Sequence, residues 1–212
     1  MGGLVQNISH GQTAEWLQNA RRRSLEAFER QGLPTPKTEA WKYTKLRDFK
    51  ADDYEIAREH TPRQKVEFPF PVYELEYVNG NLVTYGEALP EGMKLKPLSE
   101  AGEYLNRLDI ENYPFAALNG SCLEQGFLLE IKPGARFDRP LVLTYFTRPE
   151  GRNLLENIRN IIVVGAGSEI DLIEYYHYAG EVKSRYLLNQ VNEIFIAADA
   201  VVNHYKYQNE AF

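Results

Sequence analysis

The fold is decided by a turn sequence that occurs three times: Ile131-Lys132-Pro133-Gly134-Ala135-Arg136-Phe137, Val164-Gly165-Ala166-Gly167-Ser168-Glu169-Ile170 and Ile196-Ala197-Ala198-Asp199-Ala200-Val201-Val202. Aligning Pro133, Ala166 and Ala198 gives spacings of 33 residues (133 to 166) and 32 residues (166 to 198). A period of about 20–50 residues is typical of solenoids, in which each repeat buries its apolar face against the next. The sequence therefore predicts a stack of similar units from residue 126 onward.

Apolar runs around these turns are predicted to be strands, namely Phe127–Lys132, Phe137–Phe146, Asn160–Val164, Glu169–Tyr178, Tyr186–Ala197 and Ala200–Gln208. Ile161-Ile162-Val163-Val164 is apolar on both faces, as strands of parallel sheets and solenoid walls are. We therefore expect a mainly β protein whose carboxy-terminal part is a right-handed parallel β-helix. A β-sandwich or jelly roll is the alternative, since strands at near-regular spacing also suit that class.

The residues before this stretch show a different pattern. From Ser9 to Gln31 apolar residues recur on one helical face, and Gly32 then ends the pattern. Two domains are predicted: residues 1–115 form an amino-terminal α+β domain, and residues 116–212 form the first turns of the β-helix, incomplete at the carboxy end.

Further elements are predicted within the amino-terminal domain. Asn79-Gly80 lies between two strand-like runs and is typical of a type I′ hairpin turn. A third strand is expected at Met93–Leu98, a short helix at Ser99–Leu108 with Ser99 as its cap, and another helical turn at Pro114–Asn119.

Composition excludes several classes of protein. The chain has 212 residues and a net charge of −6, with Lys and Arg scattered among the acids, so nucleic acid is not expected as a partner. Cys122 is the only cysteine, which excludes an intramolecular disulfide and fits a reducing compartment, the cytoplasm. No run approaches the roughly 20 apolar residues of a membrane span, and no signal segment is evident.

The segment Gly32-Leu33-Pro34-Thr35-Pro36-Lys37-Thr38-Glu39-Ala40-Trp41-Lys42-Tyr43-Thr44-Lys45-Leu46 is unusual in placing two prolines, a Trp and a Tyr around a helix start. It resembles the "GLP-T-x-x-x-E-x-W-x-Y-T-x-L" signature near the amino terminus of SufD, a branch of the SufB/SufD family in the bacterial SUF iron–sulfur cluster assembly system. Later segments resemble the family in order: Tyr77–Gly80, Leu89–Gly92, Pro114–Asn119 and Tyr207–Glu210. The resemblance covers nearly the whole chain.

This resemblance implies a non-catalytic scaffold that acts with SufB and the ATPase SufC in iron supply and cluster assembly. In the family, the cluster-related residues and the SufC-binding helices lie further along than residue 212. The resemblance therefore assigns no catalytic, cofactor-binding or metal-binding residue here, and no cofactor is expected within the segment, while the full complex handles iron or a cluster. We also expect self-association through the carboxy-terminal strands.

The residues that could carry chemistry do not form a recognisable set. The histidines His10, His60, His177 and His204 lie in no paired ligand motif, so no local metal site is predicted; alternation indicates solvent for His204 and partial burial for His177. Cys122 is expected to be a small buried residue.

The remaining motifs are better explained by structural roles than by a catalytic or binding function. Gly165-Ala166-Gly167 lacks the third glycine of a dinucleotide fingerprint, and no P-loop occurs. Asp171 and Glu174 are predicted on opposite faces of one strand, which argues against a carbohydrate-active β-helix enzyme. A cupin-like small-molecule-binding protein, the other alternative, would need an HxH motif that is absent. The aromatic residues of the repeat region are expected to stack as a ladder with tyrosine hydroxyls at the rim, namely Tyr145-Phe146, Tyr175-Tyr176, Tyr178, Tyr205 and Tyr207.

Overall fold

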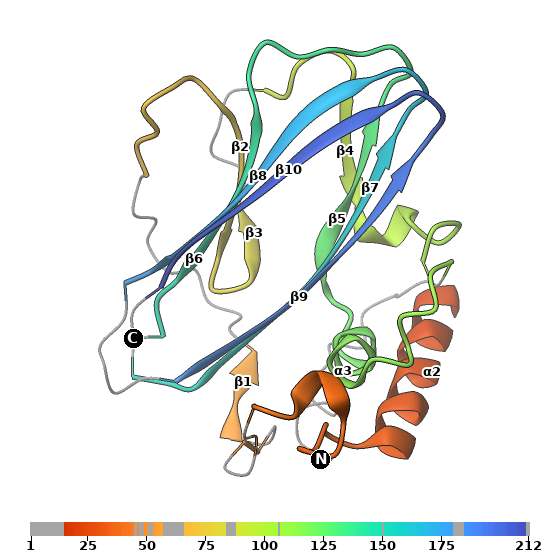
Figure 1. Ribbon diagram of the computed structural model, residues 1–212, viewed down its shortest axis with the longest axis vertical. Helices are drawn as coiled ribbons and strands as arrows, with labels where there is room; N and C mark the ends of the chain where they lie inside the picture. Colours follow the sequence, from red (N-terminus) through yellow and green to blue (C-terminus); the bar gives the residue numbers. More distant parts are fainter. Residues whose placement is uncertain are drawn as a thin grey trace.

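The computed structural model describes residues 15–44, 46, 49–50, 53–56, 66–83, 88–105, 107–149, 151–179 and 185–210. These residues form a mainly β structure in which two five-stranded sheets face each other, with helices against the outside of one of them (Figure 1). Sheet A contains β1 (Glu55–Ile56), β4 (Met93–Pro97), β5 (Gln125–Ile131), β7 (Leu154–Val164) and β9 (Tyr186–Ile196). Sheet B contains β2 (Tyr73–Val78), β3 (Asn81–Val83), β6 (Leu141–Thr147), β8 (Glu169–Tyr178) and β10 (Val201–Asn209).

From β5 onward the chain alternates between the two sheets. Each of the strands β5 to β8 pairs in parallel with the strand two positions later: β5 with β7, β6 with β8, β7 with β9 and β8 with β10. Both sheets are nevertheless mixed, because β4 runs antiparallel to β5 and β3 antiparallel to β2. A step from one strand to its neighbour in the same sheet thus advances the sequence by one full repeat.

The three similar turns stack on one another. The amide of Gly134 donates to the carbonyl of Ala166 at 2.9 Å, and that of Gly167 donates to Ala198 at 2.9 Å. Gly134, Gly167 and Asp199 occupy the same place in each turn and have positive φ angles of 72°, 66° and 59°. The predicted repeat of 33 and 32 residues is therefore confirmed at these turns, with Asp tolerated where the other two turns have glycine.

Two predicted strands had wrong starting points. β7 begins at Leu154 and not at Asn160, because its first half buries polar residues that an apolar pattern does not reveal. β6 begins at Leu141 and not at Phe137, since Pro140 lacks the amide that a central strand must donate.

In the amino-terminal part, a helix end and a turn form where residues with special backbone preferences predict them. Helix α2 (Glu15–Gln31) ends at Gly32, which has φ of 66° and donates its amide to Phe28 at 2.7 Å. The predicted stop is confirmed, whereas the predicted start at Ser9 lies outside the described residues. The hairpin is also confirmed, with φ of 48° at Asn79 and 79° at Gly80.

The helix predicted at Ser99–Leu108 is wrong. Among the described residues of this range only the 3-10 turn η3 (Leu98–Glu100) forms, so Ser99 lies within the turn and does not cap a helix. Gly102 disfavours a helix in the middle of this range, and it lies against the Trp16 ring, to which a Cβ would come within 3.1 Å. The turn predicted at Pro114–Asn119 is present as helix α3 (Pro114–Ser121), with Pro114 in its first turn.

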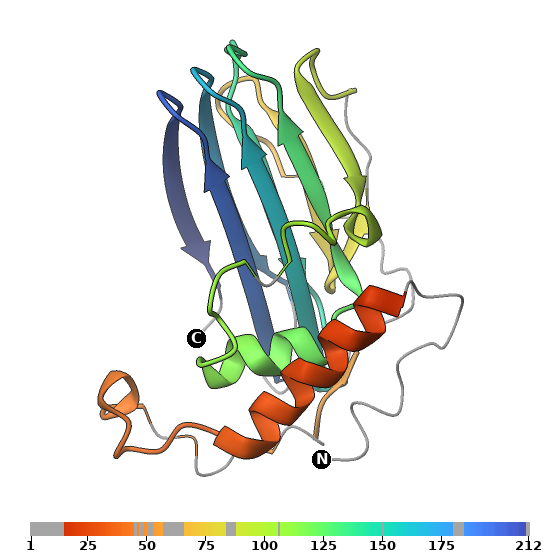
Figure 2. The same cartoon turned by 90° about the vertical axis from the view of Figure 1, so that its right-hand side faces the viewer.

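The helices cover the outer face of sheet A, as Figure 2 shows. Leu17 and Ala20 of α2 pack on Leu128 of β5 and Ile161 of β7. The 3-10 turn η1 (Glu39–Trp41) places Trp41 against Phe115 of α3, with the ring centroids 5.0 Å apart. None of the helices in the described ranges is long and apolar enough to cross a membrane.

The residues on either side of position 115 share both sheets. β2 pairs in parallel with β6, and β4 pairs with β5. The main core lies between the sheets and includes Leu75 and Met93 from before residue 115 beside Leu143 and Ile162 from after it. The division into units 1–115 and 116–212 remains a prediction.

Gly126 supplies a test of the backbone fit between β5 and β7. It has φ of 141°, and a Cβ there would lie 1.7 Å from the carbonyl oxygen of Arg159. We expect Gly126→Ala to lower the free energy of unfolding by about 3 kcal/mol or more, measured by urea denaturation. Gly134→Ala is the control: its φ is also positive, but nothing lies within 4 Å, so a cost of about 1–2 kcal/mol is expected. Equal losses in the two variants would contradict this account.

Candidate functional site

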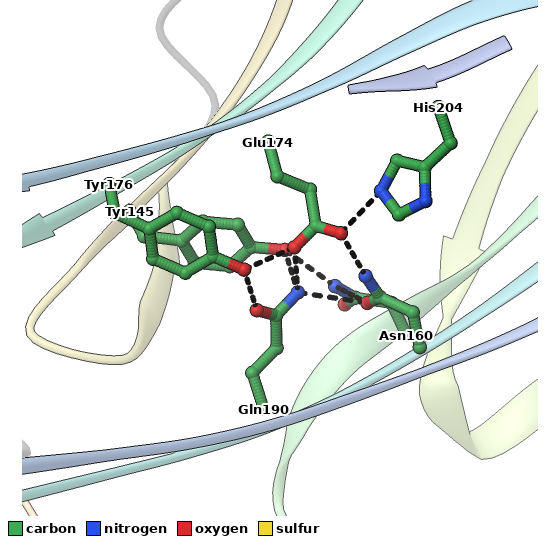
Figure 3. A network of polar contacts seen from close by, with 7 residues as sticks. Tyr145, Asn160, Glu174, Tyr176, Gln190 and His204 are labelled. Carbon is green, nitrogen blue, oxygen red and sulfur yellow. Dashed lines mark hydrogen bonds and ion pairs between the residues drawn. The ribbon is translucent and has the colours of Figure 1, made fainter. Parts of the chain in front are cut away.

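The candidate site is a polar network inside the core, between the two sheets. Sheet B contributes Tyr77, Tyr145 and Tyr176, which occupy equivalent positions on β2, β6 and β8. Sheet A contributes Asn160 of β7 and its register partner Asn192 of β9, together with Gln190. Glu174 and His204 complete the network. Figure 3 shows how the side chains labelled in it converge, namely Tyr145, Asn160, Glu174, Tyr176, Gln190 and His204.

The three tyrosines form a stacked ladder. The Tyr77 and Tyr145 rings lie 5.3 Å apart at 4°, and the Tyr145 and Tyr176 rings lie 4.7 Å apart at 17°. The predicted ladder is confirmed for Tyr145 and Tyr176 and, on the other face of sheet B, for Tyr175 and Tyr207, while the prediction does not include Tyr77. The hydroxyls of Tyr145 and Tyr176 do not lie at the rim as expected. They and the Tyr77 hydroxyl point across the core: Tyr77 donates to Asn160 Oδ1 at 2.6 Å, and Asn160 Nδ2 donates to the Tyr145 hydroxyl at 3.1 Å.

Glu174 is the centre of the network. Its carboxylate is buried, and Oε1 accepts from Asn192 Nδ2 at 3.0 Å and lies 2.6 Å from His204 Nε2. Oε2 accepts from Gln190 Nε2 at 2.9 Å and contacts the Tyr176 hydroxyl. Burial, and then the neighbouring Glu174, raise the pKa of Tyr176, so its hydroxyl keeps its proton. The buried carboxylate is therefore fully satisfied by groups from both sheets.

The histidines occupy two different environments. His204 is 38% exposed, as its predicted solvent contact requires, yet its Nε2 reaches the buried Glu174. His177 faces away from the core and is partly buried, as predicted, with its ring stacked on Phe146 at 5.6 Å and on Tyr175 at 6.1 Å. His10 and His60 lie outside the described residues.

A second polar cluster lies on the other face of sheet A, beneath α3. Arg159 of β7 and Glu193 of β9 form a buried ion pair at 2.7 Å, and Arg159 Nε donates to Asn119 Oδ1 at 2.8 Å. Asn119 Nδ2 in turn donates to the carbonyls of Ile158 and Asn189. Burial raises the pKa of Glu193 and lowers that of Arg159, while each charge opposes the shift of the other. This cluster fixes α3 on the sheet.

Cys122, at the end of α3, is buried, as predicted. Burial raises the pKa of its thiol, and the nearby Arg21 only partly opposes that shift. Because the thiolate is the form that binds metals and attacks electrophiles, the buried thiol is poorly suited to either role.

Glu156, which sequence reasoning missed, is a fully buried acid on the inner face of β7. Burial raises its pKa to about 8, with a smaller contribution from Glu210, although the nearby Thr147 hydroxyl and Gly80 amide lower it. The sequence contains a signal for this position. Glu156 lies an even number of residues from the core residues Ile158 and Ile162 and so faces the same side of the strand, but this follows only when β7 is extended back to Leu154.

The remaining sequence expectations concern motifs. Asp171 is exposed and Glu174 buried, so they lie on opposite faces of β8, as predicted. Gly165-Ala166-Gly167 leads into strand β8 and not into a helix. Within the described ranges, no group of three or more His, Cys, Asp or Glu residues could hold a metal ion.

Family comparisons agree with this architecture. Residues 5–143 match the SufBD protein N-terminal region, and residues 147–212 match the SufBD core domain of SUF system FeS cluster assembly. The chain belongs to the SufB/SufD family. The resemblance of the sequence to this family is thus confirmed, without a distinction between SufB and SufD, and a role in iron–sulfur cluster assembly follows. A search of curated proteins gives no match.

Replacing Glu174 tests whether the network stabilises the folded structure of this SufB/SufD chain. Glu174→Ala leaves the Asn192 Nδ2 donor without its acceptor and removes one of the acceptors of Gln190 Nε2, so we expect a loss of about 3 kcal/mol in unfolding free energy by urea denaturation. Asp171→Ala on the same strand removes only an exposed contact with Asn203 and should cost less than about 1 kcal/mol. A Glu174→Ala loss no larger than the control would show that the network contributes nothing.

Replacing Glu156 tests its raised pKa. Because the folded-state pKa is about 8 against an ordinary 4.5, the associated stability is complete below pH 4.5 and is lost as the pH rises to 8. Glu156→Gln cannot ionise, so relative to this variant the unchanged chain should lose on the order of 4 kcal/mol between pH 4.5 and pH 8.5. The measurement is urea denaturation across that range, with the exposed Glu91→Gln as control. Parallel pH profiles for the Glu156→Gln variant and the unchanged chain would refute the shift.

Proposed function

We propose that the chain is the amino-terminal portion of a SufD-type scaffold protein, a non-catalytic component of the cytoplasmic SUF complex. The observation that carries this proposal is the Gly32–Leu46 signature, which resembles SufD and not SufB, within a chain that matches both SufB/SufD regions. Its partners in the full-length protein are then SufB and the ATPase SufC, and iron or a nascent cluster is the cargo of the complex.

We further propose that β5–β10 are the first turns of a parallel β-helix. The parallel pairing of alternate strands supports this, because Leu141 pairs with Leu172 and Leu154 with Tyr186, one repeat later in each sheet. The stacked turns at Gly134, Gly167 and Asp199 support it as well. A β-sandwich or jelly roll would pair its strands mainly antiparallel.

A scaffold role fits the use that the fold makes of its polar residues. The buried Arg159–Glu193 pair joins neighbouring turns of the coil and holds α3, and Glu174 is bonded on both oxygens. Charged groups used in this way serve to fix a rigid surface, which is what a scaffold presents to its partners. Neither alternative gains support: Asp171 and Glu174 do not converge as a glycosidase pair, and His177 and His204 lie on opposite faces of sheet B.

The distinction between SufD and SufB can be tested by domain exchange in a bacterium that depends on its SUF system. Residues 1–212 would replace the corresponding part of SufD in one strain and of SufB in another. We expect growth and activity of iron–sulfur enzymes only in the SufD exchange, with co-purification of SufB and SufC as a control for assembly. Rescue in the SufB exchange alone would overturn the SufD proposal.

The absence of resident cluster chemistry is a second expectation. The purified chain should show no ATPase activity and bind no stoichiometric iron–sulfur cluster after anaerobic reconstitution, because Cys122 is buried and its thiol pKa is raised. Its thiol should react with a disulfide reagent only after unfolding. A visible-absorbing cluster that disappears on Cys122→Ser would contradict this expectation.

A further inference from the structure

The core has a second group of acidic and hydroxyl side chains at the end where β7 and β9 begin. Glu156 faces inward from β7, and on the opposite sheet Thr147 of β6 pairs with Tyr178 of β8 at the corresponding level. Asn209 of β10 is the register partner of His177 of β8. The next residue of the chain, Glu210, therefore lies at the level of Tyr178 and Thr147. Two carboxyl groups, Glu156 and Glu210, therefore belong to the same end of the core.

Glu156 has no completed hydrogen bond. Its side chain is fully buried, and neither Oε1 nor Oε2 has a partner among the described residues. The Thr147 hydroxyl and the Gly80 amide are near enough to affect the carboxyl group, but neither makes a hydrogen bond of good geometry. The hairpin turn closes this side, since a Cβ on Gly80 would lie 3.1 Å from the Glu156 Cα. A buried carboxyl group without a partner is costly and calls for an explanation.

Glu210 is held in a fixed position beside a cavity. The Tyr186 hydroxyl donates to its Oε1 at 2.7 Å, and Gln208 Nε2 donates to its Oε2 at 2.9 Å. Glu210 and Tyr186 line a cavity of about 430 Å³, together with Leu188, which is the register partner of Glu156. The cavity adjoins Glu210 directly and lies one strand away from Glu156, which does not itself line it. It is large enough for several water molecules.

No basic side chain in the described ranges forms an ion pair with either acid. Lys206 also lines the cavity, but its Nζ lies over the Tyr176 ring, 4.5 Å from the centroid. Two neighbouring carboxyl groups without a counterion, one of them buried and unpartnered, are complementary to a small cation. Carboxylate, hydroxyl and water oxygens are the ligands that Mg²⁺, Ca²⁺ and Mn²⁺ prefer.

We propose that Glu156 and Glu210 bind one hard divalent cation, with water from the adjoining cavity completing its coordination. Thr147 and Tyr186 supply hydroxyl groups beside the two carboxylates. Such an ion links β7 to the segment that follows β10 and so connects successive turns of the coil. Neither Glu156 nor Glu210 bonds to Glu174, although Tyr176 and Gln190 of the Glu174 network also line the cavity. The proposal does not depend on the identity of the SUF partners.

Thermal unfolding of the metal-free 212-residue chain in MgCl₂, CaCl₂ or MnCl₂, with NaCl at matched ionic strength as reference, tests the proposal. We expect at least one cation to raise Tm saturably, by about 5 °C at a hundredfold excess over its Kd. Glu156→Gln and Glu210→Gln should each abolish that added rise, whereas Glu91→Gln should retain it. Because each shift is compared with the same variant without cation, changes in basal stability do not affect the result.

Binding stoichiometry gives an independent measurement. Titration with Mn²⁺ followed by electron paramagnetic resonance should show one bound ion per chain, lost in Glu156→Gln. Absence of a saturable Tm rise with all three cations, or an undiminished rise and unit stoichiometry in Glu156→Gln, would overturn the proposal. Binding retained in Glu156→Gln but lost in Glu210→Gln would also reject it, because the buried carboxyl group would then have no part in the site.

Discussion

The parallel register of neighbouring strands is the constraint on which the rest of this structure depends. Since β7 pairs with β9 and β8 with β10 without a slip, each residue of β7 and β8 lies beside the one that follows 32 positions later, and the offset is 33 from β5 to β7 and 31 from β6 to β8. Turns, aromatic rings and amides are thereby brought into columns: Gly134 stacks on Gly167, Tyr145 on Tyr176 and Asn160 on Asn192. A shift of one residue would turn every inward side chain outward and destroy all of these columns at once.

The same register lowers the free-energy cost of burying polar side chains between the sheets. Glu174 can be buried only because Gln190 and Asn192 of β9 and Tyr176 of β8 reach its carboxyl group in a fixed arrangement. Arg159 and Glu193 depend similarly on neighbouring strands and on Asn119 of α3. Buried polar groups of this kind contribute less to stability than an apolar core would, but they favour a single register over its alternatives.

These properties suit a protein of the SufB/SufD family, for which iron–sulfur cluster assembly is the process. Helices α2 and α3 are held on the outer face of sheet A by apolar contacts and by hydrogen bonds from Asn119. Its one cysteine is buried, and its central acid is fully hydrogen-bonded.

The sequence by itself determined the repeat, the hairpin at Asn79-Gly80 and the stop at Gly32, because each depends on backbone angles that few residue types adopt. It also showed that Asp171 and Glu174 lie on opposite faces and that Cys122 is buried, since alternation and polarity are local properties. Only the tertiary structure decided where β7 begins, that the tyrosine hydroxyls point into the core, and that Glu156 is buried there. The physical reason is that a polar side chain can be buried when partners from distant segments satisfy it or its proton is retained, and neither condition is written in the neighbouring sequence.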